Sequence, residues 1–186
     1  MAWSIDNRIV FLRERQLWTF SLTDRRAELM PEQPGGDAAG TQNLSLSHGS
    51  EWAAFASVGG QPRGFRVFMR QFPGGTNYQV SRELGNAPVW SRDGRELFYF
   101  QTESRTLVSV RIQPPPAFSV TEPTIVPIKS LFQSEGEPRK FDIMPDNSFL
   151  ILQPAVQEGG AGPRATQEIH VVLNWLDELP GIAPRR

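Results

Sequence analysis

Few residues in this sequence have the types and spacing that catalysis needs, and they lie far apart. A serine nucleophile of the hydrolase type needs the pattern Gly-x-Ser-x-Gly at a strand-to-helix turn. The stretch "HGSEW" (48–52) contains Gly49-Ser50 but no second glycine. We therefore interpret Ser50 as a turn residue. The sequence predicts no catalytic residue and no intrinsic enzymatic activity.

The residue types that bind metals are equally sparse. Cysteine is absent, and His48 and His170 are the only histidines. Neither histidine has a carboxylate at ligand spacing, so a zinc site would need residues from distant segments. We predict no metal and no cofactor. We place His48 in a hairpin turn and His170 in a strand.

Three aspartates, Asp6, Asp93 and Asp146, recur at equivalent places in the chain. One interpretation is a ring of carboxylates that binds calcium or takes part in catalysis. The other is that each aspartate accepts backbone N–H bonds within its own turn, which explains the repetition without a ligand. We favour the second interpretation, so these residues are assigned no metal-binding or catalytic role.

The charge of the chain gives no indication of nucleic-acid binding. Its 19 basic residues are balanced by 20 acidic residues, which leaves a net charge of −1. The stretch "QPRGFRVFMR" (61–70) does carry Arg63, Arg66 and Arg70 between phenylalanines, an arrangement that could serve a nucleic acid. In a strand, however, alternate positions share one face. We expect these arginines to form an outward polar face, and we predict no nucleic-acid partner.

The elements that would position these residues are β-hairpins, and the hairpin is repeated four times. In "NAPVWSRDGRELFYF" (86–100) an Asp-Gly pair separates two apolar runs, which is typical of a tight hairpin turn. The motif recurs around Ser4, Ser47, Ser91 and Met144, at intervals of 43, 44 and 53 residues. Asn replaces Gly in two of the turns because it also tolerates positive φ. The four turn pairs are Asp6-Asn7, His48-Gly49, Asp93-Gly94 and Asp146-Asn147.

Each hairpin is followed by further strand-like runs. The third runs are 16–22, 65–72, 106–112 and 168–175, and short fourth runs follow at 27–30, 77–81 and 124–132. Four strands at a period near 45 residues predict β-propeller blades, and the alternative is a β-sandwich in which the turns recur by accident. Propeller blades pack face to face, so the inner strands should direct large apolar residues toward neighbouring blades. These residues are Trp3, Leu46, Trp90 and Ile143.

The repeats are similar to a known family. "APVWSRDGRELFYF" (87–100) resembles the Pro-x-Trp-Ser-x-Asp-Gly core of TolB-like propeller repeats, also described as WD-like repeats of bacterial proteins. "RVFMRQFPGGTNYQVS" (66–81) resembles the next element of that family. "IHVVLNWLDELP" (169–180) resembles the terminal blade of propellers attached to bacterial serine/threonine protein kinases. The resemblance covers nearly the whole chain, although His48-Gly49, the two Asp-Asn turns and Met144-Pro145 depart from the pattern.

The predicted fold is all-β: a single TolB-like domain over residues 1–186, built from four four-stranded antiparallel blades of which the last lacks its outer strand. The blades are expected at approximately 1–34, 43–82, 86–132 and 138–176, followed by a tail over 177–186. Blade one begins at its inner strand, and prolines exclude a ladder strand in the tail. We therefore expect an open or partial β-propeller. A bare strand edge favours self-association.

Function is predicted by elimination and from the resemblance. We expect a non-catalytic module for protein–protein interaction or ligand sensing, which binds a protein or a small ligand at its loop face or central channel. The resemblance implies the C-terminal sensor-like part of a bacterial serine/threonine kinase or a TolB-like protein. The alternative is the gating propeller of a prolyl oligopeptidase-type serine peptidase whose catalytic domain lies elsewhere.

The compartment stays open. The N-terminus lacks the pattern of a signal peptide, and no apolar run approaches the roughly 18 residues of a membrane span. A kinase-linked or TolB-like parent protein would place the domain outside the cytoplasm.

Overall fold

The computed structural model of the protein describes residues 2–14, 16–30, 40–59, 63–128, 131, 133, 137–144 and 146–152. Every regular element in these residues is a β-strand, and all of their pairings are antiparallel. The chain divides into two compact units, 1–153 and 154–186, and the second lies outside the described residues. The expected strand at 168–175, His170 and the tail at 177–186 lie there too. The absence of an outer strand from blade four therefore stays a prediction.

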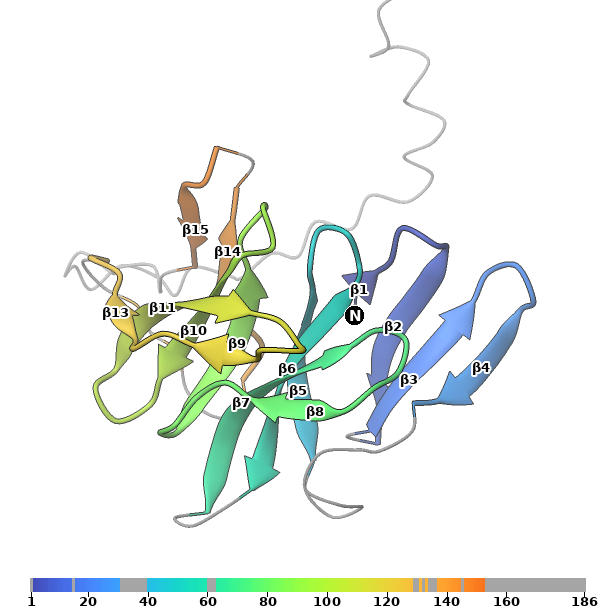
Figure 1. Ribbon diagram of the computed structural model, residues 1–186, viewed down its shortest axis with the longest axis horizontal. Helices are drawn as coiled ribbons and strands as arrows, with labels where there is room; N and C mark the ends of the chain where they lie inside the picture. The colour runs from blue at the N-terminus through green and yellow to red at the C-terminus, as the bar shows by residue number, and fades with distance from the viewer. Residues whose placement is uncertain are drawn as a thin grey trace, which may run out of the picture. The chain divides into compact units, whose positions relative to one another are not determined.

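The strands form successive sheets, one for each predicted repeat (Figure 1). Blade one contains β1 (Ala2–Trp3), β2 (Arg8–Arg13), β3 (Gln16–Ser21) and β4 (Arg26–Leu29). Blade two contains β5 (Thr41–Leu46), β6 (Trp52–Gly59), β7 (Gly64–Gln71) and β8 (Asn77–Gln79). Blade three contains β9 (Gly85–Trp90), β10 (Glu96–Gln101), β11 (Thr106–Gln113), β12 (Ser119–Val120) and β13 (Thr124–Ile125). The described strands of blade four are β14 (Phe141–Ile143) and β15 (Phe149–Ile151).

Blade three departs from the prediction at its outer edge. In place of the single strand expected over 124–132, the described residues form two short strands that pair with different parts of β11. Val120 lies opposite Ile112, and Ile125 lies opposite Val108. Prolines at 123 and 127 flank β13 and cannot donate a ladder hydrogen bond, which limits this strand to two residues.

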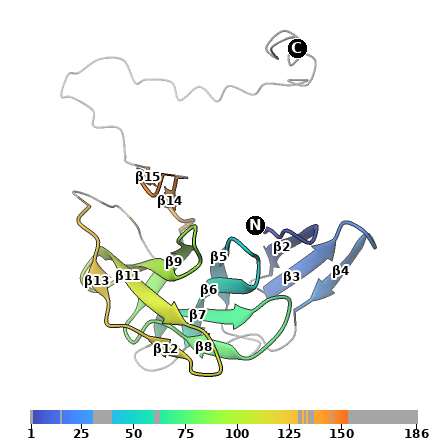
Figure 2. The same ribbon diagram turned by 45° about the horizontal axis from the view of Figure 1, so that its top comes forward.

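Each blade packs on the blade that follows it in the chain (Figure 2). In blades two to four, the side of the sheet that faces the preceding blade is called the near face. The opposite side is called the far face. The equivalent sides of blade one take the same names. The far face of blade one, with Val10 and Leu17, packs on the near face of blade two, with Ala53 and Phe55. The same arrangement joins blade two to blade three and blade three to blade four. No strand of blade one pairs with a described strand of blade four. The described part of the chain is therefore a partial β-propeller.

The prediction of an outward arginine face on β7 is wrong. Arg63 is exposed, but Arg66 and Arg70 lie on the near face of blade two and are only 7% and 0% exposed. The guanidinium of Arg66 donates to the carbonyl of Gly59. The physical reason is that both faces of a middle blade are covered by neighbouring blades, so β7 has no solvent-facing side.

The inner-strand residues expected between blades differ in burial. Trp90 is 5% exposed and lies in the core between blades two and three. Leu46 packs against the core between blades one and two, and Ile143 packs against the core between blades three and four. Trp3, by contrast, is 67% exposed. It lies on the near face of blade one, which contributes no residue to the apolar cores formed by the described residues. The expectation that Trp3 meets a neighbouring blade is therefore wrong for this part of the chain.

Candidate functional site

The hairpin turns fix their aspartates through local hydrogen bonds. The hydroxyl of Ser91 donates to Asp93 Oδ1 at 2.6 Å and accepts from the backbone N–H of Glu96 at 2.9 Å. The backbone N–H of Arg95 donates to the same Asp93 oxygen at 3.1 Å. The Ser91 hydroxyl and then the Arg95 N–H hold the pKa of Asp93 below its ordinary value. The carboxylate is thus occupied within its own turn.

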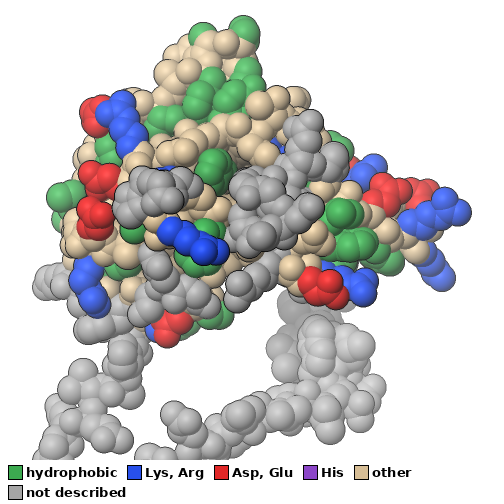
Figure 3. Space-filling model, turned by 90° about the horizontal axis from the view of Figure 1, so that it is seen from below, with side chains coloured by type: hydrophobic (Ala, Val, Ile, Leu, Met, Phe, Trp, Pro, Cys, Tyr) green, Lys and Arg blue, Asp and Glu red, His purple; other side chains and the backbone are tan. Residues whose placement is uncertain are grey.

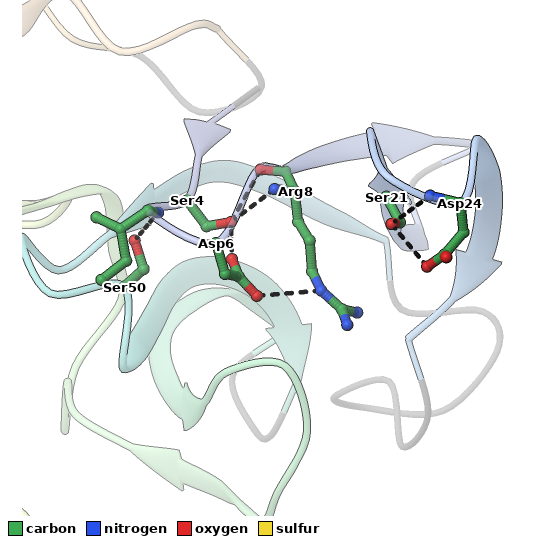
Figure 4. A network of polar contacts seen from close by, with 7 residues as sticks. Ser4, Asp6, Arg8, Ser21, Asp24 and Ser50 are labelled. Atoms are coloured by element: carbon green, nitrogen blue, oxygen red, sulfur yellow. Dashed lines mark hydrogen bonds and ion pairs between the residues drawn. The ribbon is translucent and has the colours of Figure 1, made fainter.

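The other two aspartates also have partners within their own hairpin turns. Asp146 accepts from the hydroxyl of Ser148 and also from its backbone N–H, and these two hydrogen bonds lower the pKa of Asp146. Asp6 accepts from the hydroxyl of Ser4 and forms an ion pair with Arg8, with Nε and Oδ2 3.1 Å apart (Figure 4). The prediction that the aspartates accept backbone N–H bonds within their own turns is confirmed for Asp93 and Asp146.

The turns of successive blades also contact one another. The backbone N–H of Ile5, in the turn of blade one, donates to the hydroxyl of Ser50 at 3.0 Å (Figure 4). Ser50 is 8% exposed and has a φ of 55°, so it is a buried residue of the blade-two turn. His48 is exposed in the same turn. Among the described residues, no three His, Cys, Asp or Glu side chains are grouped as metal ligands would be.

A groove of about 920 Å³ lies between the hairpin turns of blades two and three. The blade-two wall includes His48, Glu51 and Trp52, and the blade-three wall includes Arg92 and Arg95. A groove of this volume lies within the size range of ligand pockets. Its walls come from two repeats.

The groove carries both signs of charge. Glu51, Arg92 and Arg95 are exposed at its edge, and Glu96 forms an ion pair with Arg111, with Oε1 and Nε 3.0 Å apart. Acidic and basic side chains also lie next to one another on the face drawn in Figure 3. The groove edge therefore carries no excess of one sign of charge.

Aromatic side chains pack beneath one wall of the groove. Trp52 lines the groove and packs edge-on against Tyr78, with ring centroids 6.5 Å apart. Tyr78 in turn contacts Phe118 of blade three, with centroids 4.6 Å apart. Trp, Tyr and Arg are the residue types that dominate binding at protein interfaces. The groove therefore combines one aromatic wall residue, Trp52, which packs on further aromatic side chains, with an exposed charged edge.

A polar network lies at the end of the inner strands opposite to the hairpin turns, and the sequence analysis did not predict it. The side chains of Gln42 and Asn43 both donate to Asn86 Oδ1, at 3.0 and 2.9 Å. The backbone N–H of Arg139 donates to Asn43 Oδ1, and its guanidinium donates to the carbonyl of Pro88. Burial lowers the pKa of Arg139. The network joins blades two, three and four.

A sequence signal for this network does exist. Gln42, Asn86 and Arg139 each stand five residues before the residue that opens the hairpin turn, which is Ser47, Ser91 or Met144. In blades two and three the next residue, Asn43 or Ala87, has a positive φ. The pairing register of the inner strand shifts at these two residues. Asn86 is fully buried, and its side-chain oxygen accepts from Gln42, Asn43 and the backbone N–H of Ala87, so we interpret the network as structural.

The comparisons with known proteins identify the fold. No protein-family model and no curated protein sequence matches the chain. TolB from Acinetobacter baumannii is similar in structure, with a TM-score of 0.51 and 15% identity over 78% of this chain and 34% of that chain. A 6-phosphogluconolactonase-like protein from Bacteroides uniformis gives a TM-score of 0.52 and 16% identity over 81% of this chain and 45% of that chain. This chain thus spans less than half the length of either protein.

At these identities the likeness concerns the fold alone. The prediction of a β-propeller-type, TolB-like fold is confirmed. The resemblance of 169–180 to kinase-attached propellers stays a prediction. No helix among the described residues is long and apolar enough to cross a membrane.

Proposed function

We propose that this β-propeller module is non-catalytic and binds a protein partner through the groove between the hairpin turns of blades two and three. The observation that carries the proposal is the composition of this groove, which pairs an aromatic wall at Trp52 with exposed charges of both signs at Glu51, Arg92 and Arg95. Mixed charge at an interface selects partners by complementarity rather than by bulk attraction. A polypeptide segment with alternating charges is the partner that fits this edge.

We also propose that the module forms the sensor-like C-terminal part of a bacterial serine/threonine kinase, which would place it outside the cytoplasm. The support is the resemblance of "IHVVLNWLDELP" (169–180) to the terminal blade of kinase-attached propellers. The full reading frame tests this proposal. A glycine-rich nucleotide loop and a His-Arg-Asp loop upstream are expected, and an α/β-hydrolase segment downstream would contradict it.

Site-specific photo-crosslinking tests the groove. A photoreactive residue at Arg92 lies on the groove wall, whereas one at Arg105 lies in the β10–β11 turn at the opposite end of the same blade. We expect a protein adduct at position 92 in the producing cells and none at position 105. The adduct should disappear when Arg95→Glu is added to the position-92 protein, because the charge pattern of the groove edge is then reversed.

Equal adducts at positions 92 and 105, or adducts that survive Arg95→Glu, would show that the groove is not the binding surface. The non-catalytic part of the proposal has its own test. Hydrolysis of peptide, ester or lactone substrates by the purified protein, abolished by a point substitution in this chain, would contradict it.

A further inference from the structure

A polar pocket of about 400 Å³ lies on the far face of blade one, beside the turn between β3 and β4. The strand register brings its lining together: Arg8 of β2 and Arg26 of β4 lie on either side of Ser21 in β3. In the next row of the same face, Glu28 lies opposite Thr19. The lining residues are Arg8, Thr19, Ser21, Asp24, Arg26 and Glu28.

Thr19 is the buried member of this set, at 6% exposure. Its hydroxyl oxygen has no hydrogen-bond partner among the described residues. Buried hydroxyl groups in folded proteins nearly always have a partner, because they have given up their hydrogen bonds to bulk water. A buried hydroxyl that lines a pocket and bonds to no protein group therefore indicates a donor or acceptor that comes from outside the chain.

The charged groups of the pocket have unused capacity for hydrogen bonds and ion pairs. Arg26 and Glu28 are exposed, and within the described ranges neither forms an ion pair or a side-chain hydrogen bond. Arg8 uses its Nε in the ion pair with Asp6 (Figure 4). The carboxylate of Asp24 accepts from the Ser21 hydroxyl through Oδ2, at 2.9 Å. Cationic and anionic groups thus face the same hollow.

This arrangement fits a ligand that carries both signs of charge. A simple anion would bring its charge next to Asp24 and Glu28, and a simple cation would meet Arg8 and Arg26. Arg26 and Glu28 stand two residues apart on β4, which separates their Cα atoms by about 7 Å. A carboxylate and an ammonium group attached to one carbon atom can therefore contact both side chains at once.

We propose that the pocket on blade one binds a free α-amino acid. The ligand carboxylate lies between Arg8 and Arg26 and accepts from the Thr19 hydroxyl, and the ligand ammonium group lies against Glu28. A pocket of this volume also leaves room for a ligand side chain. The proposal goes beyond the partner groove between blades two and three, with which this pocket shares no residue.

Isothermal titration calorimetry on the full-length protein tests the proposal. Each proteinogenic L-amino acid is titrated, and propionate and ethylamine serve as probes that carry only one of the two charges. The variants are Thr19→Val, Arg26→Gln and Glu28→Gln. The matched control is Arg25→Gln, which removes the charge of an exposed neighbouring arginine that does not line the pocket.

We expect at least one L-amino acid to bind with a Kd below about 1 mM, and propionate and ethylamine to bind at least about tenfold more weakly. Each of the three pocket variants should weaken binding by about tenfold or more, because each removes a hydrogen bond or ion pair to a charged ligand group. Arg25→Gln should change the Kd by no more than about twofold. Thr19→Val should keep the urea midpoint of the unliganded protein, because the hydroxyl has no partner to lose among the described residues.

Four results would overturn the proposal. The first is that no L-amino acid binds. The second is that propionate or ethylamine binds as tightly as the best amino acid, which would indicate a site for a single charge. The third is an unchanged Kd in Thr19→Val. The fourth is an equal loss of affinity in Arg25→Gln and Arg26→Gln, which would indicate general attraction rather than contact. None of these results affects the crosslinking test of the partner groove.

Discussion

Trp3 and Trp90 occupy equivalent positions in their repeats but differ in burial. Replacing each by alanine tests whether they also differ in their contribution to the free energy of unfolding. Trp90 is 5% exposed and packs with Leu97, Tyr99 and Val110 against the far face of blade two. Removing a large aromatic side chain from a packed core costs about 3–5 kcal/mol. Trp3→Ala is the matched control, because Trp3 is 67% exposed and its loss should cost less than about 1 kcal/mol.

The buried area gives a similar magnitude for Trp90. A buried aromatic side chain removes about 150–250 Å² from water, which corresponds to about 4–6 kcal/mol as an upper bound. The indole N–H of Trp90 has no hydrogen-bond partner among the described residues. Trp90→Phe keeps most of the area and removes this buried donor, so its cost should be below about 2 kcal/mol.

Urea unfolding followed by far-ultraviolet circular dichroism measures these differences without depending on tryptophan fluorescence. The protein should be held at low micromolar concentration, so that self-association does not contribute to the unfolding midpoint. The expected order of destabilisation is Trp90→Ala, then Trp90→Phe, then Trp3→Ala. Equal shifts of the midpoint for the two alanine variants would refute the conclusion that Trp90 is buried between two blades while Trp3 is exposed.

Three further predictions concern polar residues. Asn86→Ala should lower the free energy of unfolding by about 1–3 kcal/mol, because the buried backbone N–H of Ala87 loses its acceptor and Gln42 and Asn43 each lose one hydrogen bond; a shift below about 0.5 kcal/mol would contradict the structural role of the network. Ser91→Ala should cost about 1 kcal/mol, since Glu96 N–H loses its acceptor, whereas the exposed Ser104→Ala should cost almost nothing in the same urea titration. Burial, followed by the charge of Glu83, raises the pKa of Tyr99 to about 12. The pKa of Tyr99 in the folded protein exceeds the unfolded value of 10.0, so the unfolded chain loses this proton first as the pH rises. The contribution of Tyr99 to the free energy of unfolding is therefore fully present below pH about 10. It falls by up to about 3 kcal/mol as the pH approaches 12. Tyr99→Phe should remove most of this slope, and an unchanged slope would show that other groups cause it.

The repeat, the strand order and the turn chemistry could be predicted from the sequence because they depend on local patterns. The Asp-Gly and Asp-Asn pairs at 93–94 and 146–147 define hairpins through residues only a few positions apart. The observed strands of blade one and blade two follow the expected runs closely. These features need no knowledge of the neighbouring blades.

Burial, by contrast, depends on which face has a neighbour. Trp3 and Trp90 occupy the same place in their repeats, yet one is exposed and the other is buried. Arg66 and Arg70 resemble surface residues in the sequence, but the blade that packs on them covers both. The Asn86 network is formed by residues more than forty positions apart, so no local pattern predicts its hydrogen bonds.

The stacking of each blade on its sequence neighbours has a consequence for how the molecule opens. Its folding free energy is approximately a sum of terms for single blades and terms for the junctions between adjacent blades. A blade at the end of the described series has one junction, whereas blades two and three have two. Amide hydrogens of β6 and β10 should therefore exchange with solvent more slowly than those of β2 and β15. Loosening one junction lowers the protection of the two blades that it joins and leaves the more distant blades close to their original exchange rates.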